Sequence, residues 1–443
     1  MARVVGSLCL ALALLLQSGT ALAARPNILV VMTDDQSAQG TMAVMPETSR
    51  LIGGSGTTFL EAHATTPSCC PSRASFFTGR YVHNHRVTSN TVPERLDQRT
   101  TLQYFLQRRG YRTALFGKYL NSWRFGKRLP HFDDYAHTTP QFEGASWNFN
   151  GRIFRNVQRY NTDVISDLGV KFIRRSERKD RTPWLAWLTP LAPHLPSTPA
   201  PRHQDAPVPP VPETPALAEG NVMDKPDFLD NARGYPEMIE TVRDDGRRSL
   251  MAVDEMVARL VRELKRKREL KNTLVVFTSD NGVMLGEHGG VAGKDLPYRA
   301  ATQIPLLVRW DRHVRAGATR TDLVSNVDVA TTLMRAAGVK RRTDGKSLFS
   351  KGRRSELFLE HFGAKTEEGD VVLAPWNALR TPSFRYAEYL DRPGGSVTFR
   401  EYYDLNADPW ELDNQASTLS PGRVAELSGR LQALSRCKRS SCP

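Results

Sequence analysis

Residues 27–35, NILVVMTDD, join a short run of aliphatic residues to two aspartates. Such a run, which follows Pro26, is typical of a strand buried on both faces of a parallel sheet. A second run of this kind, 273–278, ends near Asp280 and Asn281. Further runs lie at 111–116, 184–189 and 304–308. Because helical stretches separate these runs, we predict βαβ units and a large, mostly parallel central sheet flanked by helices, an α/β fold.

Other segments predict the elements around this sheet. Apolar residues between 250 and 264 repeat at helical spacing, with acids before them and a basic cluster after them. Residues 193–215 are crowded with proline and follow a strand end, so we expect an extended loop that is a candidate wall of a pocket. Strand-like runs at 383–390 and 398–405, and a helix-like run at 424–434, predict a small C-terminal α+β subdomain.

The length of 443 residues favours two or three units. Arg3, an apolar run and Ala21-Leu22-Ala23 match a secretory signal peptide over residues 1–23. The apolar run is shorter than the roughly 20 residues that span a bilayer, so we expect no stable membrane embedding. We predict a catalytic α/β domain over residues 24–352 and the α+β subdomain over residues 353–443. We expect secretion to the periplasm or the extracellular space, and the lack of an Asn-x-Ser/Thr acceptor favours a bacterial source.

The charge balance favours anionic partners. The chain carries 61 Lys and Arg against 47 Asp and Glu, for a formal charge of +14. Nucleic acid and sulfated glycan are both candidates, and a solvated basic surface explains the same excess. The charge alone therefore does not choose among them.

Residues 69–80, CCPSRASFFTGR, have the pattern of a nucleophile site. Cysteines in an exported protein are usually paired, and Cys437 and Cys442, with four residues between them, form a natural local pair. Cys69 and Cys70 are adjacent and would form only a strained bridge, because a relaxed disulfide needs Cα atoms roughly 4.4 to 6.8 Å apart. We therefore predict a Cys437–Cys442 disulfide and a reactive Cys69.

The two predicted strand ends are candidates for a metal site. Ligands of open α/β sheets gather beyond the carboxyl ends of the strands, where Asp34, Asp35, Asp280 and Asn281 lie. Adjacent side chains on a strand point to opposite faces, so each pair can reach one ion only if the chain turns there. Oxygen donors without histidine favour Ca²⁺ or Mg²⁺ over zinc. Ordinary turn residues are the alternative for either pair taken alone.

Together these motifs closely resemble the sulfatase family. Its signature is Cys-x-Pro-Ser-Arg, four residues and Thr-Gly-Arg, and a formylglycine-generating enzyme oxidises its cysteine, here Cys69, to formylglycine. The family's other segments match residues 110–113 with 117–118, 192–194, 279–282 with 286–288, and 293–294. The resemblance covers nearly all of the mature chain and implies an alkaline-phosphatase-like fold. It also implies one divalent cation, usually calcium, held by Asp34, Asp35, the modified Cys69, Asp280 and Asn281.

The resemblance implies roles for the basic residues as well. Lys118 and Lys294 are expected to face the sulfate oxygens, and Arg73 is expected to hold the nucleophile. His194 is expected near the leaving oxygen, and either His194 or Lys294 is a candidate for protonating it. The hydrated aldehyde attacks sulfur through one hydroxyl, and its second hydroxyl then allows the sulfate to be expelled, which a plain cysteine or serine does not permit.

One departure points to a branch of the family. Many arylsulfatases have histidine two residues after the lysine that corresponds to Lys118, whereas this chain has Leu120 followed by Asn121. This segment instead resembles the N-acetylglucosamine-6-sulfatase branch, which also has a segment similar to 83–85. We therefore expect Asn121, His83 and His85 to contact a sugar, with a surface turn as the alternative for the two histidines.

The expected function is hydrolysis of a sulfate ester, on an aryl sulfate or on a glycan such as N-acetylglucosamine 6-sulfate. The substrate would be a sulfated small molecule or glycan, with no nucleic-acid partner. One alternative keeps the fold but hydrolyses a phosphate or phosphonate ester. Another is a non-catalytic protein that binds sulfated glycan through its basic surface.

Overall fold

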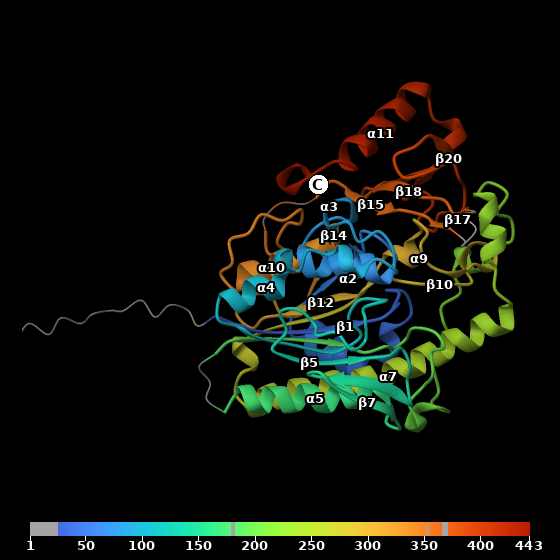
Figure 1. Cartoon of the computed structure of the whole chain (residues 1–443). Coiled ribbons are helices and arrows are strands. Elements are labelled where there is room, and N and C mark those ends of the chain that lie inside the picture. The colour runs from blue at the N-terminus through green and yellow to red at the C-terminus, as the bar shows by residue number, and fades with distance from the viewer. Residues whose placement is uncertain (1–24, 179–181, 351, 353, 366–370) are drawn as a thin grey trace, which may run out of the picture.

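The computed structural model describes residues 25–178, 182–350, 352, 354–365 and 371–443. The predicted signal peptide, residues 1–23, lies outside this part of the chain. The described residues form a large sheet with helices on both faces and, beside it, a smaller sheet from the C-terminal part of the chain (Figure 1). This arrangement confirms the predicted α/β fold class. The apolar runs that were predicted as strands overlap strands of the large sheet.

Ten strands of the described residues form the large sheet, in the order β13-β2-β12-β9-β1-β8-β4-β5-β6-β7. Its middle, from β9 to β5, is parallel. The strands are β1 (Asn27–Thr33), β2 (Thr57–Phe59), β4 (Arg112–Gly117), β5 (Asp134–Thr138), β6 (Ala145–Phe149), β7 (Arg152–Val157), β8 (Trp184–Thr189), β9 (Thr273–Ser279), β12 (Leu306–Arg309) and β13 (Ala318–Arg320).

The predicted run at 304–308 became β12, which pairs antiparallel with β9 and not parallel to it. Antiparallel neighbours need no crossover helix between them. The chain between β9 and β12 accordingly holds only the short elements β10 (Met284–Leu285), α8 (Glu287–Gly290), β11 (Ala292–Gly293) and α9 (Arg299–Thr302). The sheet is therefore parallel in its middle, with antiparallel pairs on either side and one further parallel pair, β13 with β2, at one edge.

Helices cover both faces of the sheet (Figure 1). One face packs against α5 (Asn161–Ser176) and α7 (Pro236–Arg266), and the other against α2 (Cys69–Thr78), α4 (Leu102–Arg108) and α10 (Asn326–Ala336). The predicted helix around 250–264 is the second half of α7. Every residue of β1 is buried, and successive residues contribute to opposite layers of core, as expected for a strand covered on both faces.

The C-terminal part forms an antiparallel sheet in the order β15-β18-β19-β20. Its strands are β15 (Leu357–His361), β18 (Trp376–Arg380), β19 (Phe384–Leu390) and β20 (Val397–Asp404), and α11 (Pro421–Leu434) packs on it (Figure 1). The runs predicted at 383–390, 398–405 and 424–434 correspond to β19, β20 and α11. The domain boundary between residues 352 and 353 stays a prediction.

Short elements complete the described chain. They are α1 (Pro46–Thr48), β3 (Ala62–His63), α3 (Val82–His85), α6 (Pro215–Ala218), β14 (Val324–Ser325), β16 (Ala364–Lys365) and β17 (Val371–Leu373), besides several single turns of 3₁₀-helix and one π-helical turn. The proline-rich segment holds one 3₁₀ turn, Pro201–His203, before α6 begins. Among the described helices, none combines the length and the apolar character needed to cross a bilayer.

Gly169 allows α5 to approach both the sheet and α7. A Cβ atom at this position would lie 2.7 Å from Cδ2 of Leu188 and 2.8 Å from Cδ2 of Leu260. Leu188 lies on β8 and Leu260 on α7, and both are fully buried. A larger side chain at position 169 therefore pushes α5, α7 and β8 away from one another.

We expect Gly169→Val to lower the free energy of unfolding by about 2 kcal/mol, because it overpacks a closed core. Gly429→Ala is the matched control, since a Cβ at Gly429 on α11 meets no atom within 4 Å and alanine favours helix. The midpoint of thermal unfolding measures both variants. Equal midpoints for Gly169→Val and the unmodified chain would contradict the close approach.

Candidate active site

The parallel pairing of β1 and β9 brings the predicted oxygen ligands together. Thr33 lies opposite Ser279 in the register, so the residues that follow each strand emerge at the same edge of the sheet. Asp35 has a φ of 66°, and this left-handed turn brings it round to the second strand end. Asn281 Nδ2 donates to Asp35 Oδ1 at 2.6 Å, and the Asp35 amide donates to Asp280 Oδ1 at 3.1 Å. The turn that two adjacent aspartates need in order to reach one ion is therefore present.

Cys69 is the first residue of α2 and faces this cluster. Its Sγ lies 3.5 Å from Asp34 Oδ1 and 3.7 Å from Asp35 Oδ1. The side chain is buried, with 1% of the residue exposed. Asp34, Asp35, Cys69 and His194 each offer one ligand atom, and these atoms all lie within 4.8 Å of one another.

Two lysines bring positive charge to the aspartates. Lys118 Nζ lies 2.6 Å from Asp34 Oδ2, directly after β4 ends. Lys294 Nζ lies 2.5 Å from Asp35 Oδ1 and 2.8 Å from Cys69 Sγ. The two lysines that are predicted to face the sulfate oxygens thus come to the cluster from two separate segments of the chain.

Arg73 ties three of these segments to one another. It lies one helical turn after Cys69 on α2, and its Nε donates to Asp280 Oδ2 at 2.7 Å. Its Nη1 donates to the carbonyl oxygens of Lys118 and Tyr119 at 2.7 and 3.2 Å. The guanidinium is fully buried. Its hydrogen bonds hold α2, the end of β9 and the segment after β4 in one arrangement.

Burial and neighbouring charge shift the pKa values of this cluster. Burial raises the pKa of Asp34, but the charges of Lys118 and Arg73 outweigh it and hold this pKa far below its usual range. Burial and the charge of Asp34 together raise the pKa of Asp280. Burial also raises the pKa of the Cys69 thiol well above its ordinary value. The thiol as encoded is therefore a weak nucleophile at neutral pH.

His194 lies at the more open side of the cluster. Its Nδ1 contacts the carbonyl oxygen of Leu195 at 2.6 Å, and its Nε2 lies 3.7 Å from Asp35 Oδ2. Its side chain is 28% exposed, against 15% for Lys294. Of the two candidates for the proton on the leaving group, His194 is the more accessible.

The C-terminal sheet positions Lys294 through the residue after it. Trp376 Nε1, on β18, donates to the backbone oxygen of Asp295 at 2.7 Å, and His361 Nε2 lies 3.3 Å from Asp295 Oδ1. The Asp295 amide donates to the carbonyl oxygen of Pro67 at 3.2 Å, close to Cys69 in the chain. The small subdomain is therefore part of the framework of the site.

The residues present fit a hard divalent cation. Asp34, Asp35 and Asp280 supply carboxylate oxygens, and Asn281 Oδ1 is buried without a hydrogen-bond partner among the described residues. A buried carbonyl oxygen without a partner is costly, and coordination by a cation removes that cost. The oxygen-rich set matches Ca²⁺ or Mg²⁺ better than a softer metal.

Asn121 lies next to the site, and the two histidines do not. Cys70 Sγ lies 3.9 Å from the backbone oxygen of Asn121, and Asn121 Oδ1 is buried without a hydrogen-bond partner among the described residues. Asn121 therefore stays a candidate for a sugar contact.

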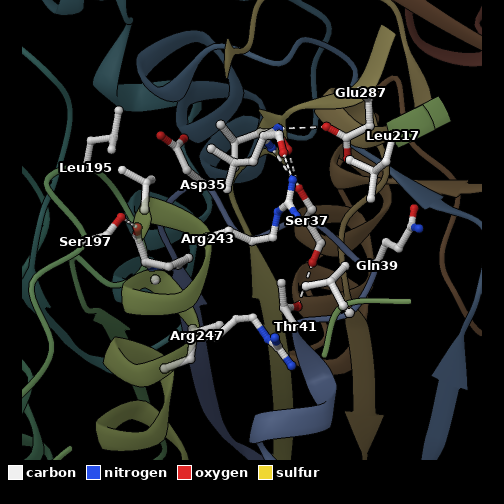
Figure 2. A pocket seen from close by; sticks show the side chains of 18 residues that line it. Asp35, Ser37, Gln39, Thr41, Leu195, Ser197, Leu217, Arg243, Arg247 and Glu287 are labelled. Carbon is white, nitrogen blue, oxygen red and sulfur yellow. Dashed lines mark hydrogen bonds between the residues drawn. The ribbon is translucent and has the colours of Figure 1, made fainter. Parts of the chain in front are cut away.

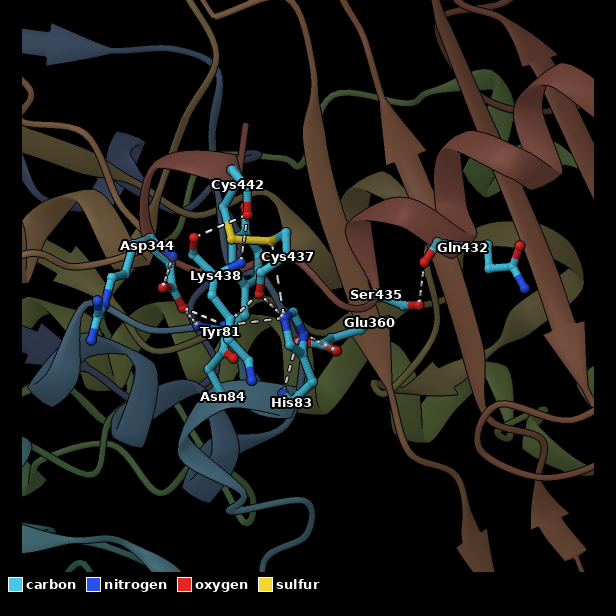
Figure 3. Close-up of a disulfide and its surroundings, with 12 residues drawn as sticks. Tyr81, His83, Asn84, Asp344, Glu360, Gln432, Ser435, Cys437, Lys438 and Cys442 are labelled. Carbon is cyan, nitrogen blue, oxygen red and sulfur yellow. Dashed lines mark hydrogen bonds and ion pairs between the residues drawn. A yellow bond between two sulfur atoms is a disulfide. The ribbon is translucent and has the colours of Figure 1, made fainter.

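The expected sugar contacts of His83 and His85 stay a prediction, and both rings form internal contacts that do not favour it. His83 Nδ1 contacts Glu360 Oε2 at 2.9 Å, and its Nε2 contacts the carbonyl oxygen of Cys437 at 2.9 Å (Figure 3). His85 is 4% exposed, its Nε2 contacts Ser75 Oγ at 3.0 Å, and its Nδ1 accepts from a backbone amide at 3.1 Å. No ring nitrogen is left for a ligand.

A disulfide joins Cys437 and Cys442 directly beside His83 (Figure 3). Their Cα atoms are 5.0 Å apart, within the relaxed range. Cys69 and Cys70 are both free. The cysteines therefore divide between a cross-link at the end of the chain and a reactive position at the site.

A pocket opens beside Asp35 between α7, the proline-rich segment and the strand end at Val283 (Figure 2). Its wall includes Arg243 and Arg247 of α7, which sequence reasoning missed. Arginines are frequent in this chain, so these two were indistinguishable from a solvated basic surface. Their spacing of four residues, which places them on one helix face, is the sequence signal that could have indicated a shared role.

Comparison with known proteins places this geometry in context. A family model described as sulfatase matches residues 26–339, and one described as N-sulphoglucosamine sulphohydrolase, C-terminal, matches residues 286–436. The chain is 28% identical over 496 residues to N-acetylglucosamine-6-sulfatase of Capra hircus, with 94% of this chain and 85% of the relative covered. It is 32% identical over 355 residues to the extracellular sulfatase SULF-1 homolog of Drosophila melanogaster, with 75% of this chain covered.

The coverage of the extracellular relatives is partial. The chain spans 32% of the length of the Drosophila protein and 51% of the length of a putative Caenorhabditis elegans homolog. Among solved structures, one of a protein in complex with its substrate D-glucosamine-2-N,6-O-disulfate has a TM-score of 0.78 at 23% identity, covering 92% of this chain and 97% of that one. The phosphonate monoester hydrolase of Agrobacterium radiobacter has a TM-score of 0.70 at 22% identity, covering 93% and 96%. These structural likenesses establish the fold.

The buried His85 makes a testable contribution to acid sensitivity. Burial lowers its pKa from 6.5 to about 3, so in the folded chain it stays neutral at pH values where the unfolded chain takes up a proton. Its contribution to stability is therefore complete above pH 6.5 and is lost as the pH falls toward 3, by at most about 1.4 kcal/mol per pH unit.

We expect His85→Gln to be less stable than the unmodified chain at pH 7.5 but to lose less stability between pH 7.5 and pH 5. The midpoint of urea unfolding at the two pH values measures this difference. Because other groups also titrate in this range, the comparison is between the two changes and not between absolute values. An equal acid-induced change in both proteins would rule out the neutral buried state of His85.

Proposed function

The chain belongs to the sulfatase family, and we propose that it hydrolyses sulfate esters through a formylglycine made from Cys69. The observation that carries this proposal is the position of Cys69 Sγ. It lies within 3.7 Å of both Asp34 and Asp35 and 2.8 Å from Lys294 Nζ. An oxygen nucleophile at this position meets a charge cluster suited to a sulfate group.

The proposed chemistry begins with the modification of the side chain. A formylglycine-generating enzyme oxidises the Cβ of Cys69 by two electrons with an external oxidant, the carbon–sulfur bond breaks, the sulfur leaves as sulfide, and an aldehyde oxygen takes its place. Addition of water to the aldehyde gives a geminal diol. One hydroxyl oxygen of the diol then attacks the sulfur of the ester, the sulfur–oxygen bond to the alcohol breaks, and the alcohol leaves with a proton.

The second hydroxyl completes the cycle. It loses its proton, the carbon–oxygen double bond forms again, and the bond from carbon to the sulfated oxygen breaks. Sulfate leaves and the aldehyde is regenerated, so no water molecule attacks sulfur. This elimination needs two oxygens on one carbon, which explains why the weakly acidic thiol of the encoded cysteine is not itself the proposed nucleophile.

The surrounding residues take the following roles in this proposal. Lys118 and Lys294 stabilise the negative charge that develops on the sulfate oxygens, and Arg73 positions the helix that carries the nucleophile. His194, the more exposed candidate, protonates the leaving oxygen. A divalent cation held by the oxygen ligands, Ca²⁺ in preference to Mg²⁺, supplies positive charge that favours the ionised form of a hydroxyl. The oxygen ligands are Asp34, Asp35, Asp280, Asn281 and the modified residue at position 69.

The proposed substrate class is a 6-sulfated amino sugar or a glycan that contains one. The similarity to N-acetylglucosamine-6-sulfatase of Capra hircus over most of both chains supports this class. The segment from Gly117 to Asn121, which resembles that branch, lies beside the site and supports it further. We also propose that the protein is exported, in line with the predicted signal peptide and the extracellular relatives.

Removal of the nucleophile tests the core of this proposal. We expect Cys69→Ala to lower the hydrolysis of a fluorogenic aryl sulfate by at least about 10³-fold, because it removes the covalent step. Peptide mass analysis of the segment around residue 69 is expected to show the aldehyde in the chain that carries no substitution. Cys70→Ala is the matched control, since it removes the neighbouring buried thiol and leaves position 69 intact. Undiminished hydrolysis by Cys69→Ala would refute the mechanism.

Turnover of different esters by the same protein preparation distinguishes a sulfatase from the two alternative functions. A phosphate or phosphonate ester hydrolase with this fold would turn over the aryl phosphate or phosphonate faster than the aryl sulfate. A non-catalytic glycan-binding protein would retain an unmodified thiol at position 69 and release no sulfate. We expect faster turnover of the sulfate ester.

Removal of the cation tests the metal site. We expect a chelator to abolish hydrolysis and Ca²⁺ to restore it more effectively than Mg²⁺. A readout that does not depend on activity is the thermal midpoint, which is expected to rise with added Ca²⁺ because the ion binds only the folded chain. Full activity in excess chelator, with a midpoint that does not respond to either ion, would contradict a divalent metal at the site.

A further inference from the structure

We propose that Arg243 and Arg247 form a second anion site in the pocket beside Asp35, and that the substrate carries another sulfate or carboxylate group besides the sulfate that is cleaved. This inference rests on the proposed function and narrows its substrate class. It follows from the position of the pocket, from the partly used hydrogen-bonding capacity of Arg247 and from the chemistry of the wall.

The pocket adjoins the candidate active site (Figure 2). It encloses about 740 Å³, including space open to solvent, and Asp35 belongs to both its wall and the cluster around Cys69. Pro193 and Leu195, on either side of His194, also line it. A molecule with its sulfate ester at position 69 therefore meets the mouth of this pocket where it passes His194.

Arg247 is a buried cation whose ion pair with Asp244 is long and whose hydrogen-bonding capacity is only partly used. The residue is 3% exposed, and its Nε and Nη1 atoms have no hydrogen-bond partner among the described residues. The nearest carboxylate is that of Asp244, at 3.7 Å from Nη1, which is too long for a hydrogen bond. In Figure 2 no dashed line reaches Arg247, although its side chain is drawn among the residues that line the pocket.

A neighbour on the same helix shows that pairing is available there. Arg248 Nη1 donates to Asp245 Oδ1 at 2.9 Å, and its Nε donates to the backbone oxygen of Ala206 at 3.0 Å. A buried charge is costly unless it is paired and hydrogen-bonded. The contrast indicates that the partner of Arg247 is a ligand and not another part of the fold.

Arg243 lies one helical turn before Arg247 and faces the same pocket. One of its nitrogens donates to the backbone oxygen of Leu285, and no carboxylate of the described residues forms an ion pair with it. The carbonyl contact holds the guanidinium in place, and its charge acts on Glu287 of the same wall without a direct ion pair among the described residues. The two arginines therefore present two forks of N–H donors on one side of the pocket.

The acids of the pocket wall are engaged elsewhere. Asp35 is paired with Lys294 at 2.5 Å, and Glu287 Oε2 accepts the amide of Leu285 at 2.7 Å. The rest of the wall is largely apolar, with Leu195, Leu217 and Val283 among its side chains. Arginine forks bind sulfate and carboxylate oxygens in a bidentate manner, and apolar walls suit the faces of a sugar ring. The chemistry fits a glycan with more than one anionic group.

Equilibrium binding tests this site without turnover. The full chain with Cys69→Ala, saturated with Ca²⁺, is titrated by calorimetry with three probes. These are N-acetylglucosamine 6-sulfate, glucosamine carrying both 6-O- and N-sulfate, and a disaccharide of 6-sulfated N-acetylglucosamine with a uronic acid. We expect at least one of the two dianionic probes to bind about tenfold tighter than the first, as a charge-assisted hydrogen-bonded pair provides. The tighter probe distinguishes sulfate from carboxylate.

In the same background, Arg247→Met is expected to reduce this preference to less than about twofold while leaving the affinity for N-acetylglucosamine 6-sulfate nearly unchanged. Arg248→Met is the matched control, and it is expected to keep the full preference because Arg248 is paired with Asp245. Arg243→Met and Arg247→Lys serve as further variants if circular dichroism shows that Arg247→Met does not fold.

Two results would overturn the inference. One is equal affinity of the Cys69→Ala chain for all three probes, and the other is a preference that survives the loss of either pocket arginine. A failure of the proposed function is a separate outcome, because it appears as absent turnover by the unmodified chain and leaves the binding comparison intact.

Discussion

The structure depends on a buried network of opposite charges at the carboxyl ends of β1 and β9. Asp34, Asp280 and Arg73 are fully buried, and each would be costly there alone. Arg73 bridges to Asp280, and Lys118 pairs with Asp34, so each ion supports the others. Because a carboxylate without its cation would destabilise the fold at this point, the network requires one arrangement of the strand ends.

That requirement draws distant segments of the chain into one framework. The end of β1 reaches the end of β9 through the register of a parallel pair, and α2 enters between them. The C-terminal sheet takes part as well, because Trp376 and His361 hold Asp295 next to Lys294. Glu401 of β20 accepts the hydroxyl of Tyr298 and thereby anchors the same segment. The small subdomain therefore acts on the site through the position of Lys294.

The pocket adds a second level to this organisation. The lysines around Cys69 form close ion pairs with the aspartates, whereas Arg247 on the adjoining face of α7 has only a long ion pair with Asp244 and two nitrogens without a hydrogen-bond partner among the described residues. The charged residues around Cys69 need a precise internal arrangement. The arginines of α7 leave nitrogen donors that a ligand can bind. A site that processes one anionic group thus lies beside a wall that is suited to another.

Local sequence determined much of the molecule. The stretches 28–32 and 274–277 are apolar throughout, as strands covered on both faces require, and the oxygen ligands follow them closely. The motif at 69–80 indicated Cys69 as the candidate nucleophile and Arg73 as its neighbour, because the proposed chemistry needs those residues at close spacing. The direction of β12, the packing role of His83 and His85, and the pocket arginines were decided only by the tertiary structure. These features depend on which distant atoms become neighbours and on whether a charge finds its partner, and neither spacing nor residue type along the chain contains that information.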